Sequence, residues 1–178
     1  MLSKADNENL TRSGKGTPMG ELLRRFWQPA LLSAELPERD GAPWKIRILG
    51  EDLLAFRDSN GRIGIVEPNC PHRGANLYFG RNEECGIRCA YHGWKFDVDG
   101  NCVDLPTSPP ESSYKDTIKL LAYPTREFAD FIWVYMGPPE AMPELPTIAE
   151  AGVKGYSTTT WYGALAPANT RPAIVQKL

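Results

Sequence analysis

Apolar and polar residues alternate along several short stretches of the chain, as they do in half-buried β-strands. W-K-I-R-I-L at 44–49 alternates apolar and charged residues, and two further predicted strands, D-L-L-A-F-R at 52–57 and R-I-G-I-V at 62–66, follow it after turn residues. Gly50-Glu51 predicts the first connecting turn and Ser59-Asn60-Gly61 predicts the second. K-F-D-V at 95–98, followed by Asp99-Gly100-Asn101, predicts another hairpin. Later strands are expected at 117–122 and 131–136.

Helical periodicity is confined to the N-terminal part of the chain. Thr17 is a suitable N-cap and Pro18 suits the first helical position, so a short helix is predicted to begin there and end by Pro29. We expect residues 1–16 to be a flexible N-terminus, residues 17–146 to form one domain, and residues 147–178 to be a poorly packed tail. A proline-rich loop at 105–113 lies inside the domain.

Composition narrows the class of protein. The chain has 178 residues, of which 42% are hydrophobic and 24% charged, which is ordinary for a globular protein. A net charge of −2 predicts no nucleic-acid partner. The longest apolar run, 131–136, is too short to cross a bilayer, and no signal peptide is found, so we expect a cytoplasmic protein with no membrane partner. Its four cysteines are then expected as free thiols or metal ligands.

The two histidines of the chain both lie beside cysteines, as Cys70-x-His72 and Cys89-x-x-His92. Zinc accepts two cysteines and two histidines, but its usual knuckle pairs two cysteines two to four residues apart. A 2Fe–2S cluster with two cysteines on one iron and two histidines on the other needs the mixed supply seen here. Two ferric ions, two sulfides and two thiolates sum to zero charge with neutral imidazoles, so such a cluster accepts one electron readily.

C-P-H-R-G-A at 70–75 and C-A-Y-H-G-W-K-F-D at 89–97 resemble the Rieske cluster motif in its oxygenase form. With the flanking G-E-D-L-L-A-F-R-D, they look like the N-terminal domain of phthalate dioxygenase-like ring-hydroxylating oxygenases, over roughly residues 14–146. The resemblance implies a mostly β fold: a Rieske-type antiparallel β sandwich with a small cluster-binding subdomain and a short N-terminal helix. It also implies that Cys70, His72, Cys89 and His92 bind a 2Fe–2S cluster.

Neighbouring positions separate subclasses of this family. Respiratory-type Rieske proteins carry an extra disulfide, where this chain has Ala75 and Tyr91. They also carry a serine and a tyrosine hydroxyl near the cluster, where this chain has Trp94 and Phe96. Fewer donors to sulfur make reduction harder, so a potential near the low end of the Rieske range, about −150 mV, is expected.

Other residues near the motif have competing interpretations. Arg73 either donates hydrogen bonds to the cluster loop or a partner, or is an ordinary solvated surface arginine. Gly74 and Gly93 either allow tight loops with amides facing sulfur or are ordinary turn glycines. Trp94 packs either over the cluster base or in a plain core. No histidine remains to pair with Cys85 or Cys102, so both are expected to be spare thiols.

The resemblance also implies a mononuclear non-haem iron held by two histidines and a carboxylate, but no third histidine is present, so this sequence does not support that site. Asp130 departs from the glycine common in the family, which predicts a strained turn. We therefore interpret the chain as an oxygenase subunit that is truncated or frame-shifted before the catalytic domain.

Four functional interpretations remain: an oxygenase electron-transfer domain, a free-standing Rieske ferredoxin, a zinc-binding interaction module and a non-functional remnant. The first is favoured by the N-terminal helix and the oxygenase-like flanks. The resemblance implies a flavin or iron–sulfur reductase as electron donor and other oxygenase subunits, trimeric in the family, as partners.

Overall fold

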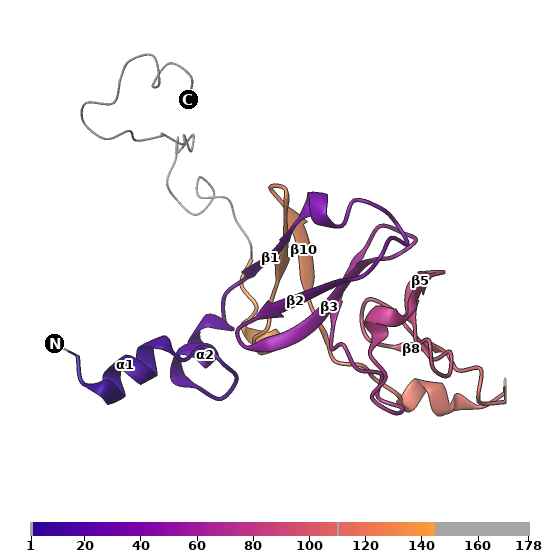
Figure 1. Ribbon diagram of the computed structural model, residues 1–178, viewed down its shortest axis with the longest axis horizontal. Helices are drawn as coiled ribbons and strands as arrows, with labels where there is room; N and C mark the ends of the chain where they lie inside the picture. Colours follow the sequence, from indigo (N-terminus) through magenta and orange to yellow (C-terminus); the bar gives the residue numbers. More distant parts are fainter. Residues whose placement is uncertain (1, 110, 145–178) are drawn as a thin grey trace, which may run out of the picture. The chain divides into compact units, whose positions relative to one another are not determined.

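The computed structural model describes residues 2–109 and 111–144, which form three antiparallel sheets (Figure 1). The first sheet has the order β1 (Gln28–Leu32), β11 (Phe131–Val134), β10 (Thr125–Phe128). The second has the order β2 (Trp44–Ile48), β3 (Glu51–Arg57), β4 (Ile63–Val66), β9 (Ala122–Tyr123). The third has the order β5 (Arg81–Glu83), β6 (Gly86–Arg88), β7 (Lys95–Phe96), β8 (Cys102–Asp104).

Helical elements in the described residues are short: α1 (Lys4–Thr11), α2 (Pro18–Leu23), and the 3₁₀ turns η1 (Ser33–Glu35), η2 (Leu77–Phe79), η3 (Ser113–Thr117) and η4 (Pro139–Ala141). The predicted mostly β fold is confirmed. No helix in this part of the chain has the length and apolar character that a bilayer crossing requires.

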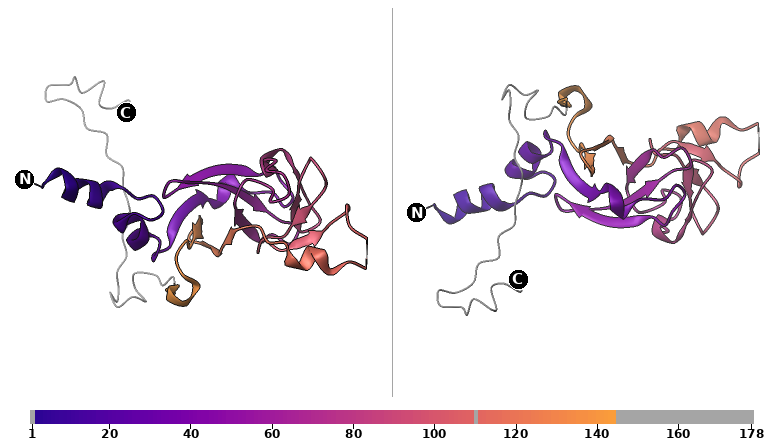
Figure 2. Two further views of the ribbon diagram at one scale, coloured as in Figure 1. Left: turned by 90° about the horizontal axis from the view of Figure 1, so that it is seen from below. Right: turned by 90° about the horizontal axis from the view of Figure 1, so that it is seen from above.

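Strands β3 and β4 are buried on both faces, which explains why their sequences are apolar runs instead of strict alternations. One face, with Leu53 and Ala55, packs in a core with the first sheet. The opposite face, with Leu54 and Phe56, packs in a second core with the β5–β8 sheet. Figure 2 shows the β5–β8 sheet at one end of this arrangement. The second core also contains Cys70 and Cys89. Packing against the β2–β3–β4–β9 sheet, the central sheet of the fold, therefore positions both thiols.

The predicted N-terminal helix is shorter than expected. Thr17 caps α2 by accepting a hydrogen bond from the Gly20 backbone N–H, as the sequence indicated, but the helix ends at Leu23. The segment that follows enters β1 and contains Pro29. Proline lacks the N–H that pairing on both sides of a strand requires. Strand β1 tolerates Pro29 because β11 is its single neighbour in the sheet and the register shifts just after Pro29. Helix α1 lies within the stretch expected to be flexible.

The strand expected at 117–122 is largely wrong. Residues Ser113–Thr117 form η3, and only Ala122–Tyr123 pair as a strand, with β4. Ile118 and Leu120 are buried in the second core, so their apolar character reflects core packing. The Leu120 N–H donates to the Gly100 carbonyl, which attaches this segment to the β7–β8 turn.

A two-residue turn joins β10 to β11, and both of its residues adopt left-handed backbone conformations. Ala129 has φ 52° and Asp130 has φ 63°, between the paired residues Phe128 and Phe131. Such a turn favours glycine and asparagine, because a Cβ makes this region costly. The predicted strain at Asp130 therefore has a geometric basis.

Replacing Asp130 with glycine is expected to raise the free energy of unfolding by about 0.5–1 kcal/mol, because glycine has no Cβ and adopts the left-handed conformation without steric strain. Urea unfolding followed by circular dichroism measures it. Asp116→Gly, at a backbone position outside this region, should instead lower stability. Equal effects of the two replacements would contradict the assignment of strain.

Candidate metal centre

Two loops with the same hydrogen-bonding pattern carry the four predicted ligands. In the loop 70–75, the Cys70 N–H donates to the Ala75 carbonyl at 2.9 Å and the Gly74 N–H donates to the Cys70 carbonyl at 2.8 Å. In the loop 89–94, the Cys89 N–H donates to the Trp94 carbonyl at 2.9 Å and the Gly93 N–H donates to the Cys89 carbonyl at 3.1 Å. Each loop therefore closes on itself and presents its cysteine in the same way.

Both loops have glycine at the fifth position, where the backbone is left-handed. Gly74 has φ +70° and Gly93 has φ +77°, a region that side chains rarely adopt. A Cβ at Gly93 would also approach Pro106 Cγ at 3.2 Å, whereas nothing lies within 4 Å of one at Gly74. Backbone conformation favours glycine at both positions, and close packing adds to the preference at Gly93.

The structure brings the four predicted residues together. Cys70 and Cys89 are 2% and 4% exposed, and the half-buried imidazoles of His72 and His92 lie with ring centroids 4.6 Å apart. Nδ1 of His72 is buried without a hydrogen-bond partner among the described residues. A buried ring nitrogen with a free lone pair costs free energy unless it binds something, and metal ligation meets that need.

Protonation favours the same interpretation. Burial raises the pKa of the Cys70 thiol to about 11, so a thiolate there requires a compensating cation, which a bound metal ion would supply. Burial, followed by the neighbouring His92, lowers the pKa of His72 below its ordinary value and keeps the imidazole neutral, the form that binds metal. The donor set therefore fits a metal group.

The composition of the donor set, two thiols and two imidazoles, suits a two-iron cluster of mixed ligation. Among residues 2–109 and 111–144, no group of three or more His, Cys, Asp or Glu side chains surrounds a single point suited to one ion. Tetrahedral zinc needs four ligands around one point. A 2Fe–2S cluster needs a cysteine pair at one iron and a histidine pair at the other, and the four predicted residues are of these two types.

Aromatic rings flank both histidines. Trp94 stacks on His72 with ring centroids 4.4 Å apart and planes inclined by 4°, and Tyr91 contacts His92 at 3.8 Å. Trp94 is buried, whereas Tyr91 is 62% exposed. Trp94 therefore packs directly against a predicted ligand, and the Tyr91 side of the site faces solvent. Arg73 is exposed.

Arg88 is a site residue that the sequence analysis missed. Its guanidinium is 12% exposed, and Nη1 donates to the Gly93 carbonyl at 2.8 Å and to Asp104 Oδ2 at 2.7 Å. Its Nε donates to Glu83 Oε1 at 2.6 Å. Arg88 thus ties the loop 89–94 to strands β5 and β8. The one sequence signal for a structural role of Arg88 was its position as a charged residue between the apolar Ile87 and the predicted ligand Cys89, both of which the structure shows to be buried.

Glu83 supplies a pH-dependent part of this attachment. Hydrogen bonds from Arg81 and then Arg88 lower the pKa of its carboxyl from 4.5 to about 2. A lowered carboxyl pKa stabilises the folded state fully above about pH 4.5, and this contribution declines progressively and is lost below about pH 2.

Glu83→Gln is therefore expected to be less stable than the parent at pH 7, with a difference that shrinks as the pH falls from 4.5 towards 2. Urea unfolding at pH 7, 4 and 3 measures the difference. A gap that stays constant over this range would contradict the role of Glu83 ionisation.

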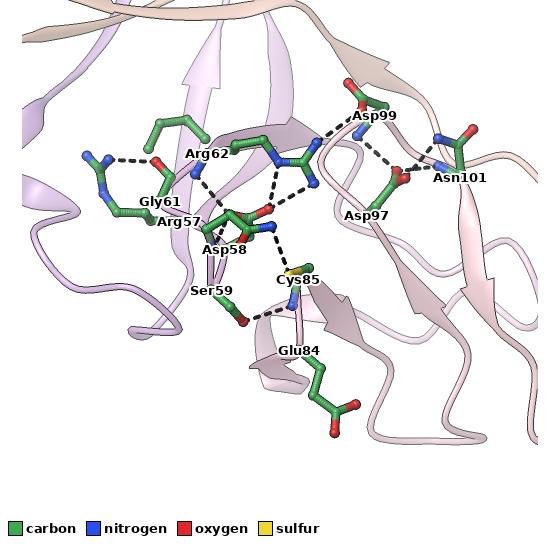
Figure 3. A network of polar contacts seen from close by, with 12 residues as sticks. Arg57, Asp58, Ser59, Gly61, Arg62, Glu84, Cys85, Asp97, Asp99 and Asn101 are labelled. Carbon is green, nitrogen blue, oxygen red and sulfur yellow. Dashed lines mark hydrogen bonds and ion pairs between the residues drawn. The ribbon is translucent and has the colours of Figure 1, made fainter.

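A polar network attaches the turns of the β5–β8 sheet to the central sheet (Figure 3). Fully buried Asp58 accepts hydrogen bonds from the backbone N–H and Nε of Arg62, and Arg62 Nη1 lies 3.6 Å from Asp99 Oδ2. Ser59 Oγ accepts from the Cys85 N–H at 2.9 Å. The β5–β6 and β7–β8 turns are both held, so the loop 89–94 lies between fixed strands.

The two cysteines outside the motif lie in different parts of the fold. Cys102 is buried in the second core, and Cys85 lies in the β5–β6 turn, where its Sγ accepts a hydrogen bond from Asn60 Nδ2 at 3.2 Å. Both are free thiols. Their expected role as spare thiols stays a prediction.

Residues 26–124 match the family model described as Rieske [2Fe-2S] domain. The chain belongs to this family. The 3-chlorobenzoate-3,4-dioxygenase oxygenase subunit of Comamonas testosteroni is 50% identical over 148 residues, which are 83% of this chain and 34% of that protein. The phthalate 4,5-dioxygenase oxygenase subunit of Pseudomonas putida is 48% identical over 144 residues, 81% of this chain and 33% of that protein. The Rieske domain is thus of the ring-hydroxylating oxygenase type, as predicted.

Solved structures support the same assignment of the fold. A crystal structure of dicamba monooxygenase with non-haem iron and dicamba superimposes with a TM-score of 0.62 at 28% identity, covering 71% of this chain and 38% of that one. The predicted Rieske-type fold is confirmed. This chain spans about a third of the length of the curated relatives named above.

Residues 138–178 match a different family model, described as tripartite tricarboxylate transporter family receptor. This match covers less than half of the chain. The tail predicted at 147–178 lies outside the described residues.

Proposed function

We propose that Cys70, His72, Cys89 and His92 hold a Rieske 2Fe–2S cluster, with both thiolates on one iron and both imidazoles on the other, and that the chain transfers single electrons. The observation that carries this proposal is the occurrence of two buried thiols with two adjacent imidazoles, one of which has a buried nitrogen without a partner in the described part of the chain. When bound, the cluster supplies a one-electron redox couple.

The protein's own residues exclude water from one side of the site and leave the other open. The thiols lie in the second core, which also contains Leu77 and Phe96, both fully buried. His92 is half-buried behind exposed Tyr91. We therefore place the surface that exchanges electrons with partners at the Tyr91–His92 edge.

The wider context is an oxygenase. The resemblance implies an oxygen-activating iron with two histidine ligands, and the two histidines of this sequence are already assigned. We propose that residues outside this sequence hold that iron, and that a flavin or iron–sulfur reductase supplies the electrons in the cytoplasm. Association with other oxygenase subunits is part of the same proposal.

We also propose that the electron-transfer unit spans residues 17–146, between an N-terminal segment 1–16 and a separate segment 147–178. The family match at 26–124 lies inside these bounds, and the compact unit Met1–Pro143, which also includes residues 1–16, ends near the second boundary. The Nε1–H of Trp27 donates to the Pro143 carbonyl at 2.8 Å, which ties the end of that unit to the start of β1.

A free-standing Rieske ferredoxin is the alternative. The relatives that match over about four-fifths of this chain are oxygenase subunits, at 48–50% identity, which favours the oxygenase domain. Electron delivery to an oxygenase added as a separate protein, with normal turnover, would favour the ferredoxin.

The reconstituted protein is expected to be red-brown, to give a low-g EPR signal on reduction, and to have a potential near the low end of the Rieske range, about −150 mV. Phe96→Tyr should raise the potential, because a hydroxyl donating to sulfur stabilises the reduced cluster. An EPR-monitored redox titration measures both. A value well above zero would contradict the subclass, and a colourless zinc-loaded protein would contradict the proposal itself.

A further inference from the structure

Trp94 connects a predicted cluster ligand to a residue outside both cluster loops. Its indole ring is 7% exposed and lies nearly parallel to the His72 imidazole, at 4.4 Å between centroids. Its Nε1–H donates to Thr107 Oγ1 at 3.0 Å. A buried indole N–H needs an acceptor, so this single hydrogen bond selects the rotation of the ring.

Thr107 belongs to a short segment, 104–107, that contacts the loop 89–94 and the preceding residue Arg88. Asp104 accepts from Arg88, which also donates to the Gly93 carbonyl. Pro106 closes over Gly93, where a Cβ would lie 3.2 Å from its Cγ. The segment therefore follows the loop 89–94 from its backbone to the Trp94 side chain.

We propose that Thr107 is a positioning residue for the cluster: by accepting the Trp94 N–H it holds the indole against His72 and thereby sets the plane of that imidazole. This inference rests on the proposed function. The plane of a metal-bound imidazole determines how its nitrogen lone pair points at the metal, and residues behind the ligands usually set it.

The side chain of Thr107 is suited to a clean test. It is exposed, so replacing its hydroxyl with a methyl group removes an acceptor while removing little packing. Valine has nearly the same shape as threonine and lacks the acceptor. The adjacent Ser108 is half-buried on the same segment and provides a matched control as Ser108→Ala.

The test compares cluster-loaded parent, Thr107→Val, Thr107→Ser and Ser108→Ala. Two quantities are measured: the rate of iron loss to a chelator, and the anisotropy of the EPR signal of the reduced cluster. Thr107→Val is expected to lose iron about 10-fold faster and to give a broadened, shifted EPR signal. Thr107→Ser retains the acceptor and restores both quantities, and Ser108→Ala leaves both unchanged.

Trp94→Phe keeps an aromatic ring but lacks the N–H, so combining it with Thr107→Val should add nothing to the effect of Trp94→Phe alone. Thr107→Val with the iron-loss rate and EPR signal of Ser108→Ala overturns the positioning role while the proposed function stands. A parent protein that binds no 2Fe–2S cluster overturns the proposed function instead.

Discussion

Cys70→Ser is expected to abolish cluster loading, leaving no more than about a tenth of the parent's iron and sulfide. The Cys70 side chain is 2% exposed, and a serine hydroxyl at this position does not ionise to replace the thiolate. His92→Ala is expected to do the same, because each iron of the proposed cluster would have only two protein ligands. Iron and acid-labile sulfide assays on protein reconstituted in parallel measure the loss.

Cys102→Ser is the matched control for this result. Cys102 is 5% exposed and lies in the same core as Cys70, so both replacements place a hydroxyl in an apolar environment. Only the ligand variant should lose the cluster. Cys70→Ser with the iron content of the parent would refute the ligand assignment, and loss in both variants would attribute the effect to core packing.

The largest expected effect on stability comes from Arg24→Met, at about 3 kcal/mol. The Arg24 side chain is 5% exposed, and its Nη1 lies 2.7 Å from Glu51 Oε1. Its Nη2 donates to the Leu49 carbonyl at 3.2 Å, which ties the end of α2 to the β2–β3 turn. Removing the cation leaves the Glu51 carboxylate without its counter-charge in a largely buried position.

Tyr123 increases this dependence on Arg24. Its hydroxyl donates to Glu51 Oε2 at 2.7 Å, and burial, followed by that carboxylate, raises the pKa of the phenol above its ordinary value. The phenol therefore stays protonated and continues to donate, but it brings no positive charge. One neutral donor cannot replace the guanidinium.

Arg47→Met provides the comparison on the same hairpin. Arg47 pairs with Asp52, and both side chains are more than two-thirds exposed, so the loss should be at most about 1 kcal/mol. Urea unfolding followed by circular dichroism distinguishes the two variants. Equal losses of unfolding free energy in the two variants would show that burial of the Arg24–Glu51 pair adds nothing to its contribution to stability.

The central strands and both cluster loops could be predicted from the sequence because their signals are local. The stretch 52–57 predicts a strand, and the structure adds that β3 is buried on two faces, which explains its apolar run. The Cys–His spacing in each loop predicts a shared site, and the fold brings His72 and His92 into contact. Hydrophobic periodicity and ligand spacing both extend over a few neighbouring residues, so they can be recognised without knowledge of the tertiary structure.

Other features depend on partners that are distant in sequence. Strand β1 forms because Phe131–Val134 pairs with it, which local periodicity around Pro29 does not indicate. Ile118 and Leu120 look like strand residues, but tertiary packing buries them beside a 3₁₀ turn. Arg88 gains its role from Glu83 and Asp104, which reach it only after the β5–β8 sheet has formed.

Both imidazoles of the chain lie at the candidate site, and this gives the protein a built-in spectroscopic reporter. A sample labelled with ¹⁵N only at histidine carries signals from His72 and His92 and from no other residue. Paramagnetic iron bound to either ring would shift and broaden both resonances, because the two rings are in contact. Cluster loading, loss and redox state could therefore be followed in the purified protein, free of background from the rest of the chain.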